Sequence, residues 1–353
     1  MRLHISKILS MNLKISLICI VLILYSCDLR DKNLKSVENQ YATLFEVMSD
    51  GKVTIVKFKE KNKAWNSISI TQIPKRIIIL SSSHAGFINE LGLKENVIAV
   101  SNKRYFYDSF YQKSDIEEVG DMESLNIEKI LKLKPDIVFL HPNSLPQSPI
   151  LDILNKAKIQ YIITNEYAET DVLAQAEWIK IYGAVFNVSE KSDSIFSVVN
   201  KSFNNILAKE KSKNTPKVMT GFPWNHQWYV SSSKSIFAQL ITKLGGNYLV
   251  EVNVSENMPL GIESILKMGK NADIWINIST LKSIAEIKQK IDFWQNLSPI
   301  TKGQCYNNNK LERPYGANDY WESGIVRPDL IAMDLYNIIQ QRDTNYHYYL
   351  KLQ

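Results

Sequence analysis

Apolar and polar positions along the chain follow two different periodicities. Short aliphatic runs such as "RIIILSS" are typical of strands that are covered on both faces. Between these runs, apolar residues recur every three or four positions, which predicts helices. The strands are expected at 76–82, 97–101, 136–140 and 160–164, and the helices at 85–91, 127–134 and 150–158. This alternation predicts a lobe at 74–170 with a mostly parallel sheet flanked by helices.

The same alternation restarts after Pro216 and indicates a second lobe at 214–343. Its strands are expected at 217–222 and 272–278, and its helices at 235–246, 262–269 and 284–294. A tail is expected at 344–353. The predicted fold class is therefore α/β, with two lobes of mostly parallel sheet flanked by helices.

Residues 171–213 lie between the lobes and predict a helical linker. Apolar residues such as Ile195, Val199 and Phe203 recur at helical spacing, and neither proline nor glycine occurs from Ser189 until Pro216. A helix over 189–212 would be about 36 Å long. We expect this long helix to hold the two lobes almost rigidly.

The N-terminal segments indicate the compartment. Residues 1–26 place basic side chains before an apolar run that is short for a bilayer span, as in a signal peptide. The run ends in "LYSC", which is similar to a lipobox, so Cys27 is expected to be lipidated and to anchor the protein to the membrane on the periplasmic side. A hydrophobic helix that stays attached is the alternative, and either Met1 or Met11 could be the start.

Two extensions are expected between the anchor and the first lobe. Residues 27–40 contain few apolar side chains, which predicts a flexible tether. Residues 41–73 contain two alternating runs separated by Asp50 and Gly51, which predicts a β-hairpin extension of open role.

Charge and cysteine content exclude two classes of protein. Loss of Arg2, Lys7 and Lys14 with the signal lowers the formal net charge from +6 to +3, which argues against a nucleic-acid partner. Once Cys19 is removed and Cys27 is lipidated, Cys305 has no cysteine to pair with, and its role is left open. We expect a monomer that is stabilised by packed cores.

Two stretches of the chain have similar sequences: "LNIEKILKLKPDIVFL" at 125–140 and "LGIESILKMGKNADIWIN" at 260–277. Glu128 and Glu263 fall in the first turn of each predicted helix, off the apolar face. The helix dipole alone favours an acid there, by about 0.3–1 kcal/mol. The second interpretation is that both lobes present a carboxylate to a two-fold-symmetric partner that carries arginines.

These phrases, together with "PKRIIILSSSHAGFINELGLKENVIAVSN", "WYVSSSKSIFAQLITKLGGNYL" and "SGIVRPDLIAMDL", resemble the class III, helical-backbone substrate-binding proteins of ABC importers. The resemblance implies a ligand held between two lobes, and docking of Glu128 and Glu263 onto a permease dimer that works with its ATPase. The ligands it implies are ferric siderophores, haem, cobalamin or bare metal ions. The chain departs from the family pattern at Gly86, where many relatives have glutamate, and at Met122, where cobalamin binders have tryptophan, which makes cobalamin less favoured.

The ligand is expected at the carboxyl ends of the strands, where α/β sheets bind their ligands. The loops predicted there are rich in aromatic residues and contain arginines that could pair with a metal chelate. The candidate ligand-binding residues are Arg104, Tyr105, Tyr107, Asp121, His141, Trp224, His226, Trp228, Arg313, Tyr315, Tyr320 and Trp321. This set favours a large, flat, partly anionic ligand. Alternatively, individual aromatic residues simply pack within the lobes.

The histidines suggest an alternative, direct binding of a transition metal. His84, His141 and His226 fall on predicted strand-end loops, and Asp121, Asp319 or Glu322 could join them. One of the histidines or Tyr105 could also be an axial ligand of haem iron.

An enzyme is the alternative from a different class. The mature chain contains no G-x-S-x-G, G-x4-G-K-[ST], H-E-x-x-H or C-x-x-C motif, although a cleft metallohydrolase is conceivable. We therefore expect a binding lipoprotein without a resident cofactor, which captures a ferric siderophore or haem.

Overall fold

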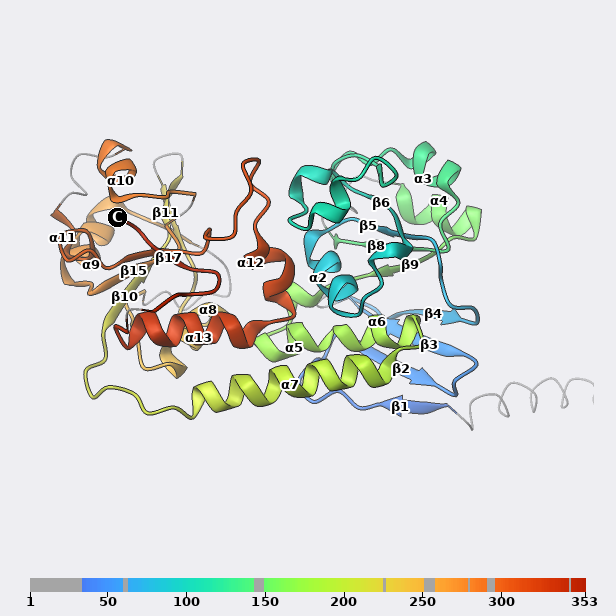
Figure 1. Cartoon of the computed structure of the whole chain (residues 1–353), viewed down its shortest axis with the longest axis horizontal. Helices are drawn as coiled ribbons and strands as arrows, with labels where there is room; N and C mark the ends of the chain where they lie inside the picture. Colours follow the sequence, from blue (N-terminus) through green and yellow to red (C-terminus); the bar gives the residue numbers. More distant parts are fainter. Residues whose placement is uncertain are drawn as a thin grey trace, which may run out of the picture.

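The computed structural model consists of two α/β lobes joined by a helical linker, as the sequence predicted (Figure 1). It describes residues 34–353 except 60–62, 143–148, 225–226, 251–257, 279, 291–295 and 343. Within the described residues, no helix has both the length and the hydrophobicity to span a bilayer.

The N-terminal lobe is built on a five-stranded parallel sheet with the order β7-β6-β5-β8-β9. The strands are β5 (Ile77–Ile79), β6 (Val97–Val100), β7 (Glu117–Glu118), β8 (Ile137–Leu140) and β9 (Gln160–Ile163). The helices α2 (Ser82–Glu90), α3 (Ile127–Leu133) and α4 (Ile150–Ala157) connect them. Every side chain of β5 and β8 is buried, because helices cover both faces of the sheet.

The C-terminal lobe has a second five-stranded sheet, with the order β13-β10-β15-β16-β17. Its strands are β10 (Lys217–Thr220), β13 (Asn247–Tyr248), β15 (Ile274–Ile276), β16 (Cys305–Asn307) and β17 (Leu350–Lys351). Its helices are α8 (Ile236–Lys243), α9 (Ile262–Asn271), α10 (Ile284–Lys290), α11 (Ser298–Thr301), α12 (Asp319–Glu322) and α13 (Pro328–Ile339). The predicted tail is part of this lobe, because β17 pairs antiparallel with β16 and Tyr348 and Tyr349 are buried.

A small antiparallel sheet, β11-β12-β14, lies beside the C-terminal lobe's main sheet. It consists of β11 (Phe222–Trp224), β12 (Gln227–Val230) and β14 (Met258–Leu260). The sequence did not predict this sheet.

The linker consists of α5 (Val172–Glu177), α6 (Ile179–Val185) and α7 (Ser189–Leu207). The part of the linker before α7 is divided into two helices at Trp178, and α7 ends at Leu207 instead of Ser212. Its 19 residues are about 28 Å long. After Leu207 the chain offers "AKEKS", which has no large apolar side chain to pack on the core.

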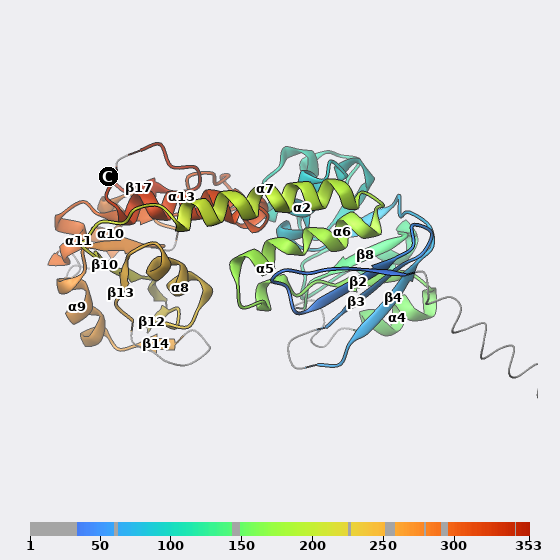
Figure 2. The same cartoon turned by 90° about the horizontal axis from the view of Figure 1, so that it is seen from below.

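Helix α7 belongs to both cores. Phe196 packs into the core of the N-terminal lobe, whereas Val199, Phe203 and Ile206 pack into a core of the C-terminal lobe. The helix lies against α6 on one side and α13 on the other (Figure 2). The two lobes therefore share one rigid element.

The N-terminal extension is a four-stranded antiparallel sheet. Its strands are β1 (Lys35–Val37), β2 (Phe45–Ser49), β3 (Thr54–Phe58) and β4 (Asn66–Ile70). The predicted hairpin corresponds to β2 and β3, which turn at Gly51 with a φ of +83°. The tether predicted at 27–40 is corrected for residues 34–40, because β1 and the residues after it pair and hydrogen-bond with the body; residues 27–33 lie outside the described residues.

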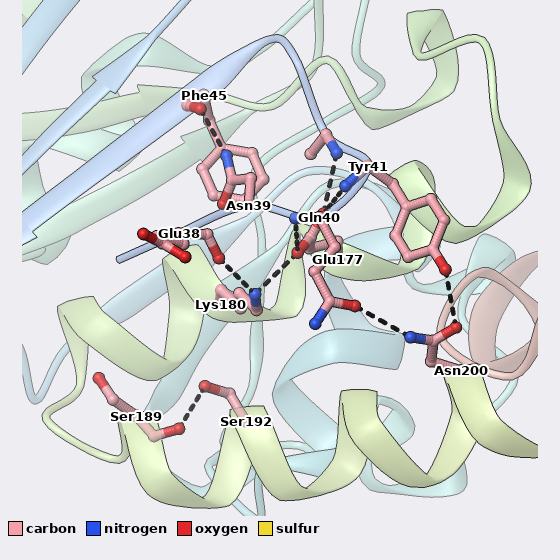
Figure 3. Close-up of polar contacts among 11 residues, drawn as sticks. Glu38, Asn39, Gln40, Tyr41, Phe45, Glu177, Lys180, Ser189, Ser192 and Asn200 are labelled. Carbon is pink, nitrogen blue, oxygen red and sulfur yellow. Dashed lines mark hydrogen bonds and ion pairs between the residues drawn. The ribbon is translucent and has the colours of Figure 1, made fainter. Parts of the chain in front are cut away.

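Two buried glutamates fasten the chain after β1 to the linker helices. The carboxylate of Glu177 accepts hydrogen bonds from the backbone N–H groups of Gln40, Tyr41 and Ala42, each at 2.8 Å (Figure 3). The ammonium group of Lys180 donates to the same carboxylate at 2.7 Å. Four donors thus satisfy a side chain that has no exposed surface.

Glu169 repeats this arrangement for the next residues. Its carboxylate accepts the N–H groups of Thr43 and Leu44 and the indole N–H of Trp178, at 3.0–3.1 Å. The N–H groups of residues 40–44 are thus all bound by carboxylates of the linker region, which fixes the N-terminal sheet to the linker.

Candidate functional site

A cleft of about 510 Å³ lies between the two lobes. Most of its wall comes from the carboxyl ends of strands and from the helix starts that follow them, as expected for α/β sheets. The N-terminal lobe contributes Ser81, Ser82, Ser83, His141, Glu166 and Tyr167, and helix α5 of the linker contributes Val172 and Gln175. The C-terminal lobe contributes Thr220, Gly221, Tyr229, Ser231, Ile236, Phe237, Leu240, Asn277, Tyr320, Trp321, Gly324, Ile325 and Ile331.

Helix α2 begins at the floor of the cleft with a capping box. Ser81 is the N-cap and accepts the N–H of Ser83, and the His84 ring accepts the N–H of Ser81 in return. The other ring nitrogen of His84 lies 2.7 Å from the Thr164 hydroxyl, so it carries the proton and donates. Burial lowers the pKa of His84 well below its usual range. His84, predicted to be a loop residue and a metal ligand, is instead a fully buried structural residue with both nitrogens engaged.

Glu166 lies on the same floor, in the short 3₁₀ helix η6 (Glu166–Ala168) that follows β9. Its residue surface is only 2% exposed. One carboxylate oxygen accepts a hydrogen bond from the Ser83 hydroxyl at 2.7 Å. The other oxygen, Oε2, is buried without a hydrogen-bond partner among the described residues. The sequence analysis missed Glu166, although its position directly after a strand is the same signal that pointed to His141.

His141 and Tyr167 form a stacked pair beside Glu166. Their ring centroids are 5.3 Å apart and the rings are inclined by 23°. Burial lowers the pKa of His141, and the negative charge of Glu166 opposes that effect. The neutral imidazole is therefore favoured at neutral pH.

Aromatic side chains form much of the opposite wall. Tyr320 and Trp321 of α12 meet edge to face, with ring centroids 4.7 Å apart, and Trp321 is largely exposed. Tyr229 from β12 and Phe237 from α8 face the same cleft. Of the predicted ligand-binding residues, His141, Tyr320 and Trp321 line the cleft.

Three predicted residues form a separate surface cluster. The Arg104 guanidinium lies 2.5 Å from the hydroxyl of Tyr105 and 3.8 Å from the carboxylate of Asp121. All three side chains are substantially exposed, and none belongs to the cleft wall. Their assignment to the cleft is therefore corrected.

Tyr107 and Arg313 lie in a second pocket of about 400 Å³, where α12 meets the N-terminal lobe. The Arg313 guanidinium donates to the backbone carbonyl of Tyr107 and covers its ring. Glu322 accepts the N–H groups of Tyr107 and Asp108 at 2.6 and 3.0 Å. Burial raises the pKa of Glu322 to about 7, although both hydrogen bonds oppose this shift. These contacts join the lobes beside the cleft.

Trp228 is a structural residue, contrary to its prediction as a ligand contact. It is 2% exposed, its indole N–H donates to the carbonyl of Thr220, and its ring stacks on Trp275. Tyr315 is 83% exposed, on a loop outside the cleft wall. The side chain of Trp224, together with His226 and Cys27, lies outside what the structure describes.

The residues that the structure describes contain no group of three His, Cys, Asp or Glu side chains that could hold a metal ion. Asp319 and Glu322, proposed as partners of the histidines, line the second pocket and not the cleft. Cys305 is buried in β16, and burial raises the pKa of its thiol to about 12. It is therefore a packing residue with an inert thiol.

Comparisons with known proteins agree with this architecture. The sequence profile described as "Periplasmic binding protein" matches residues 77–308. An uncharacterised lipoprotein of Methanocaldococcus jannaschii is 24% identical over 82% of this chain and 72% of its own length. The Fe(3+)-citrate-binding protein of Bacillus subtilis is 21% identical over 69% of this chain and 75% of its own. The vitamin B12-binding protein of Pectobacterium atrosepticum is 24% identical over 49% of this chain and 61% of its own.

Solved structures show the same fold. A periplasmic binding protein from Veillonella parvula has a TM-score of 0.63 at 14% identity, covering 82% of this chain and 99% of that one. A periplasmic heme binding protein from Pseudomonas aeruginosa has a TM-score of 0.59 at 16% identity, covering 77% and 94%.

Proposed function

Because the chain belongs to the periplasmic binding protein family, we propose that it captures a metal chelate or a tetrapyrrole between its lobes and delivers it to an ABC permease. The observation that carries this proposal is the cleft of about 510 Å³ between two lobes that share helix α7. This volume is typical of small-molecule sites. A shared helix allows the lobes to receive a ligand without a large change in their relative position.

The ligand class follows from the cleft wall and from the relatives. Aromatic residues such as Tyr229, Phe237 and Trp321 offer flat apolar contacts to a planar or globular chelate. Relatives are named for binding ferric citrate and vitamin B12, and a solved structure of the same fold is named for heme. A ferric siderophore or haem is our first candidate, and cobalamin is the second.

Docking onto the permease is proposed for Glu128 and Glu263. Glu128 lies in the first turn of α3 and Glu263 in the first turn of α9, and both residues are exposed. Figure 1 places α3 and α9 in different lobes. The two carboxylates would therefore meet the two halves of a permease dimer, where arginines could bind them.

The proposed location is the periplasmic side of a membrane, with a lipid anchor at Cys27. The relative from Methanocaldococcus jannaschii is named as a lipoprotein, which supports this assignment. A binding role also accounts for the paired exposed carboxylates, which a cleft hydrolase would not need.

Two measurements test the proposal. Exchange of Glu128 and Glu263 for alanine should leave ligand affinity unchanged within about twofold while abolishing uptake in cells that contain the permease. A matched double variant, Glu46→Ala with Glu95→Ala, removes two exposed carboxylates elsewhere and should transport normally. Loss of ligand binding in the purified Glu128/Glu263 variant, or normal uptake, would contradict the docking role.

A further inference from the structure

The charge of the cleft indicates which ligands it can hold. Glu166 is the only Asp, Glu, Lys or Arg among the described residues of the cleft wall. The internal segments outside the described residues add no arginine, and only 60–62, between β3 and β4, contains a lysine. Among the residues that the structure describes, the cleft wall therefore combines one carboxylate with no lysine or arginine.

The arginines expected to bind an anionic ligand are engaged elsewhere. Arg104 is paired with Tyr105 and Asp121 on the surface, and Arg313 is bound to Tyr107 in the second pocket. His141 does not compensate, because burial lowers its pKa and favours the neutral ring. A polyanionic guest would thus enter the cleft without a counter-charge, which is costly once water is removed.

Glu166 also has an unused acceptor. Ser83 donates to one oxygen at 2.7 Å, whereas Oε2 is buried and has no hydrogen-bond partner among the described residues. Burial of a polar oxygen without a partner is unfavourable, and a donor from a guest would remove that cost.

The aromatic wall favours the same kind of guest. Tyr229 and Trp321 expose large parts of their rings, and Tyr167 stacks on His141 at the other side. Aromatic faces attract cations and pack against flat apolar groups. A ligand with an apolar surface and a side chain that carries an N–H or O–H donor could pack against the aromatic rings and bind Glu166 at the same time.

Resting on the proposed function, we infer that the cleft selects neutral or cationic chelates that present an N–H or O–H donor to Glu166, and that it rejects polyanionic chelates. Corrinoids with amide side chains and ferric hydroxamates with a pendant ammonium group belong to the selected class. Citrate and catecholate complexes of iron belong to the rejected class, and haem with two ionised propionates is disfavoured. The inference thus narrows the first candidate named above to neutral or cationic ferric siderophores and ranks cobalamin ahead of haem.

Equilibrium dialysis of the full chain in detergent, with bound cobalt or iron as the readout, tests this inference. The probes are cyanocobalamin, ferrioxamine B, ferric citrate, ferric enterobactin and haem. We expect cyanocobalamin or ferrioxamine B to bind at least about tenfold more tightly than any of the three anionic probes. Glu166→Gln should weaken that binding by about tenfold or more, which corresponds to one charge-assisted hydrogen bond. Glu95→Gln makes the same charge change at an exposed position of the same lobe and should have no effect.

A second variant keeps the inference testable if Glu166→Gln does not fold. Gln175→Lys adds a cation to the cleft wall from helix α5 and leaves Glu166 intact. It should raise the affinity for ferric citrate or haem by about tenfold and lower that for the cationic probe.

The outcomes separate the two proposals. Preferred binding of an anionic chelate that neither variant alters would overturn the inference and leave the proposed function standing. Failure of the wild-type chain to bind any of the five probes would overturn the proposed function and the inference together.

Discussion

The hydrogen bonds between Glu177 and residues 40–42 offer the sharpest test of how the N-terminal sheet stabilises the fold. Glu177→Gln replaces a fully buried carboxylate with a neutral amide that has a single acceptor oxygen. The carboxylate now binds three backbone N–H groups at 2.8 Å and the ammonium of Lys180 at 2.7 Å. In the variant, the amide NH₂ would face backbone donors, and Lys180 would keep its charge without its carboxylate partner.

The expected magnitude follows from the burial of the pair. Each hydrogen bond to a charged group contributes about 1.5–3 kcal/mol, but such contributions are not additive. Removal of one partner from a buried ion pair costs about 3–5 kcal/mol. We expect the free energy of unfolding to fall by that amount, which is a large fraction of the roughly 5–15 kcal/mol of a typical protein. The exposed pair of Glu46 and Lys57 provides the control, because Glu46→Gln should cost less than about 1 kcal/mol.

Urea unfolding followed by tryptophan fluorescence measures this loss, and hydrogen exchange locates it. The amides of residues 40–42 should lose protection first, since they lose their acceptor. Addition of Lys180→Met to Glu177→Gln should recover part of the stability, because it removes the unpaired ammonium. A loss below about 1 kcal/mol in Glu177→Gln, with unchanged exchange at these amides, would refute the reasoning.

Two further predictions concern the contact between α12 and the N-terminal lobe. Burial raises the pKa of Glu322 to about 7 from an ordinary value of 4.5. The folded state therefore favours the protonated carboxyl group, and the free energy of unfolding should fall by up to about 3 kcal/mol as the pH rises from 4.5 to 7. Urea unfolding at pH 5 and pH 8 should show a larger loss of unfolding free energy in the wild type than in Glu322→Gln. An identical loss in both proteins would contradict the assignment. Gly86→Ala should destabilise the protein by about 1–3 kcal/mol despite the better helix propensity of alanine, because an added Cβ would lie 2.0 Å from the backbone oxygen of Glu322. Ser82→Ala in the same helix is the control, and a Gly86→Ala protein as stable as the wild type would show that α12 can move away at little cost.

The architecture could be predicted because burial imposes a clear pattern. Strands such as β5 and β8 are covered on both faces and are therefore uniformly aliphatic, and the predicted positions match them within a few residues. The end of α7 was placed five residues too late, because "AKEKS" is compatible with a helix but makes no packing contact that would sustain one. Helix propensity alone does not determine where a helix ends.

The cleft could be predicted only in part. Of the residues expected from the rule that ligands bind at strand ends, His141, Tyr320 and Trp321 lie in the cleft wall, and their contact with a ligand stays a prediction. Arg104 does not line the cleft as predicted, because a loop can direct a side chain toward solvent as well as toward the cleft. The carboxylate of Asp121 pairs with the Arg104 side chain at the surface. Glu166 was not predicted, because the surrounding sequence "NEYAE" contains nothing that distinguishes a cleft carboxylate from an exposed loop acid.

Trp228 shows a second limit of prediction from sequence. A tryptophan near a strand end reads in the same way whether it packs or binds, and only the partner of its indole N–H decides. That partner is the backbone carbonyl of Thr220, at the end of β10 in the main sheet of the C-terminal lobe. Its position therefore depends on tertiary packing, which local patterns do not contain.

If Cys27 carries the proposed lipid anchor, the early start of β1 limits the distance between the folded body and the bilayer. Seven residues, 28–34, lie between Cys27 and Lys35, and a fully stretched chain over these eight Cα–Cα steps reaches about 29 Å at most. Such a short tether would keep the local concentration of the protein near a membrane-embedded acceptor in the millimolar range, as is typical of short linkers. Each captured molecule would then be offered to the same small patch of membrane repeatedly, without diffusion across the periplasm.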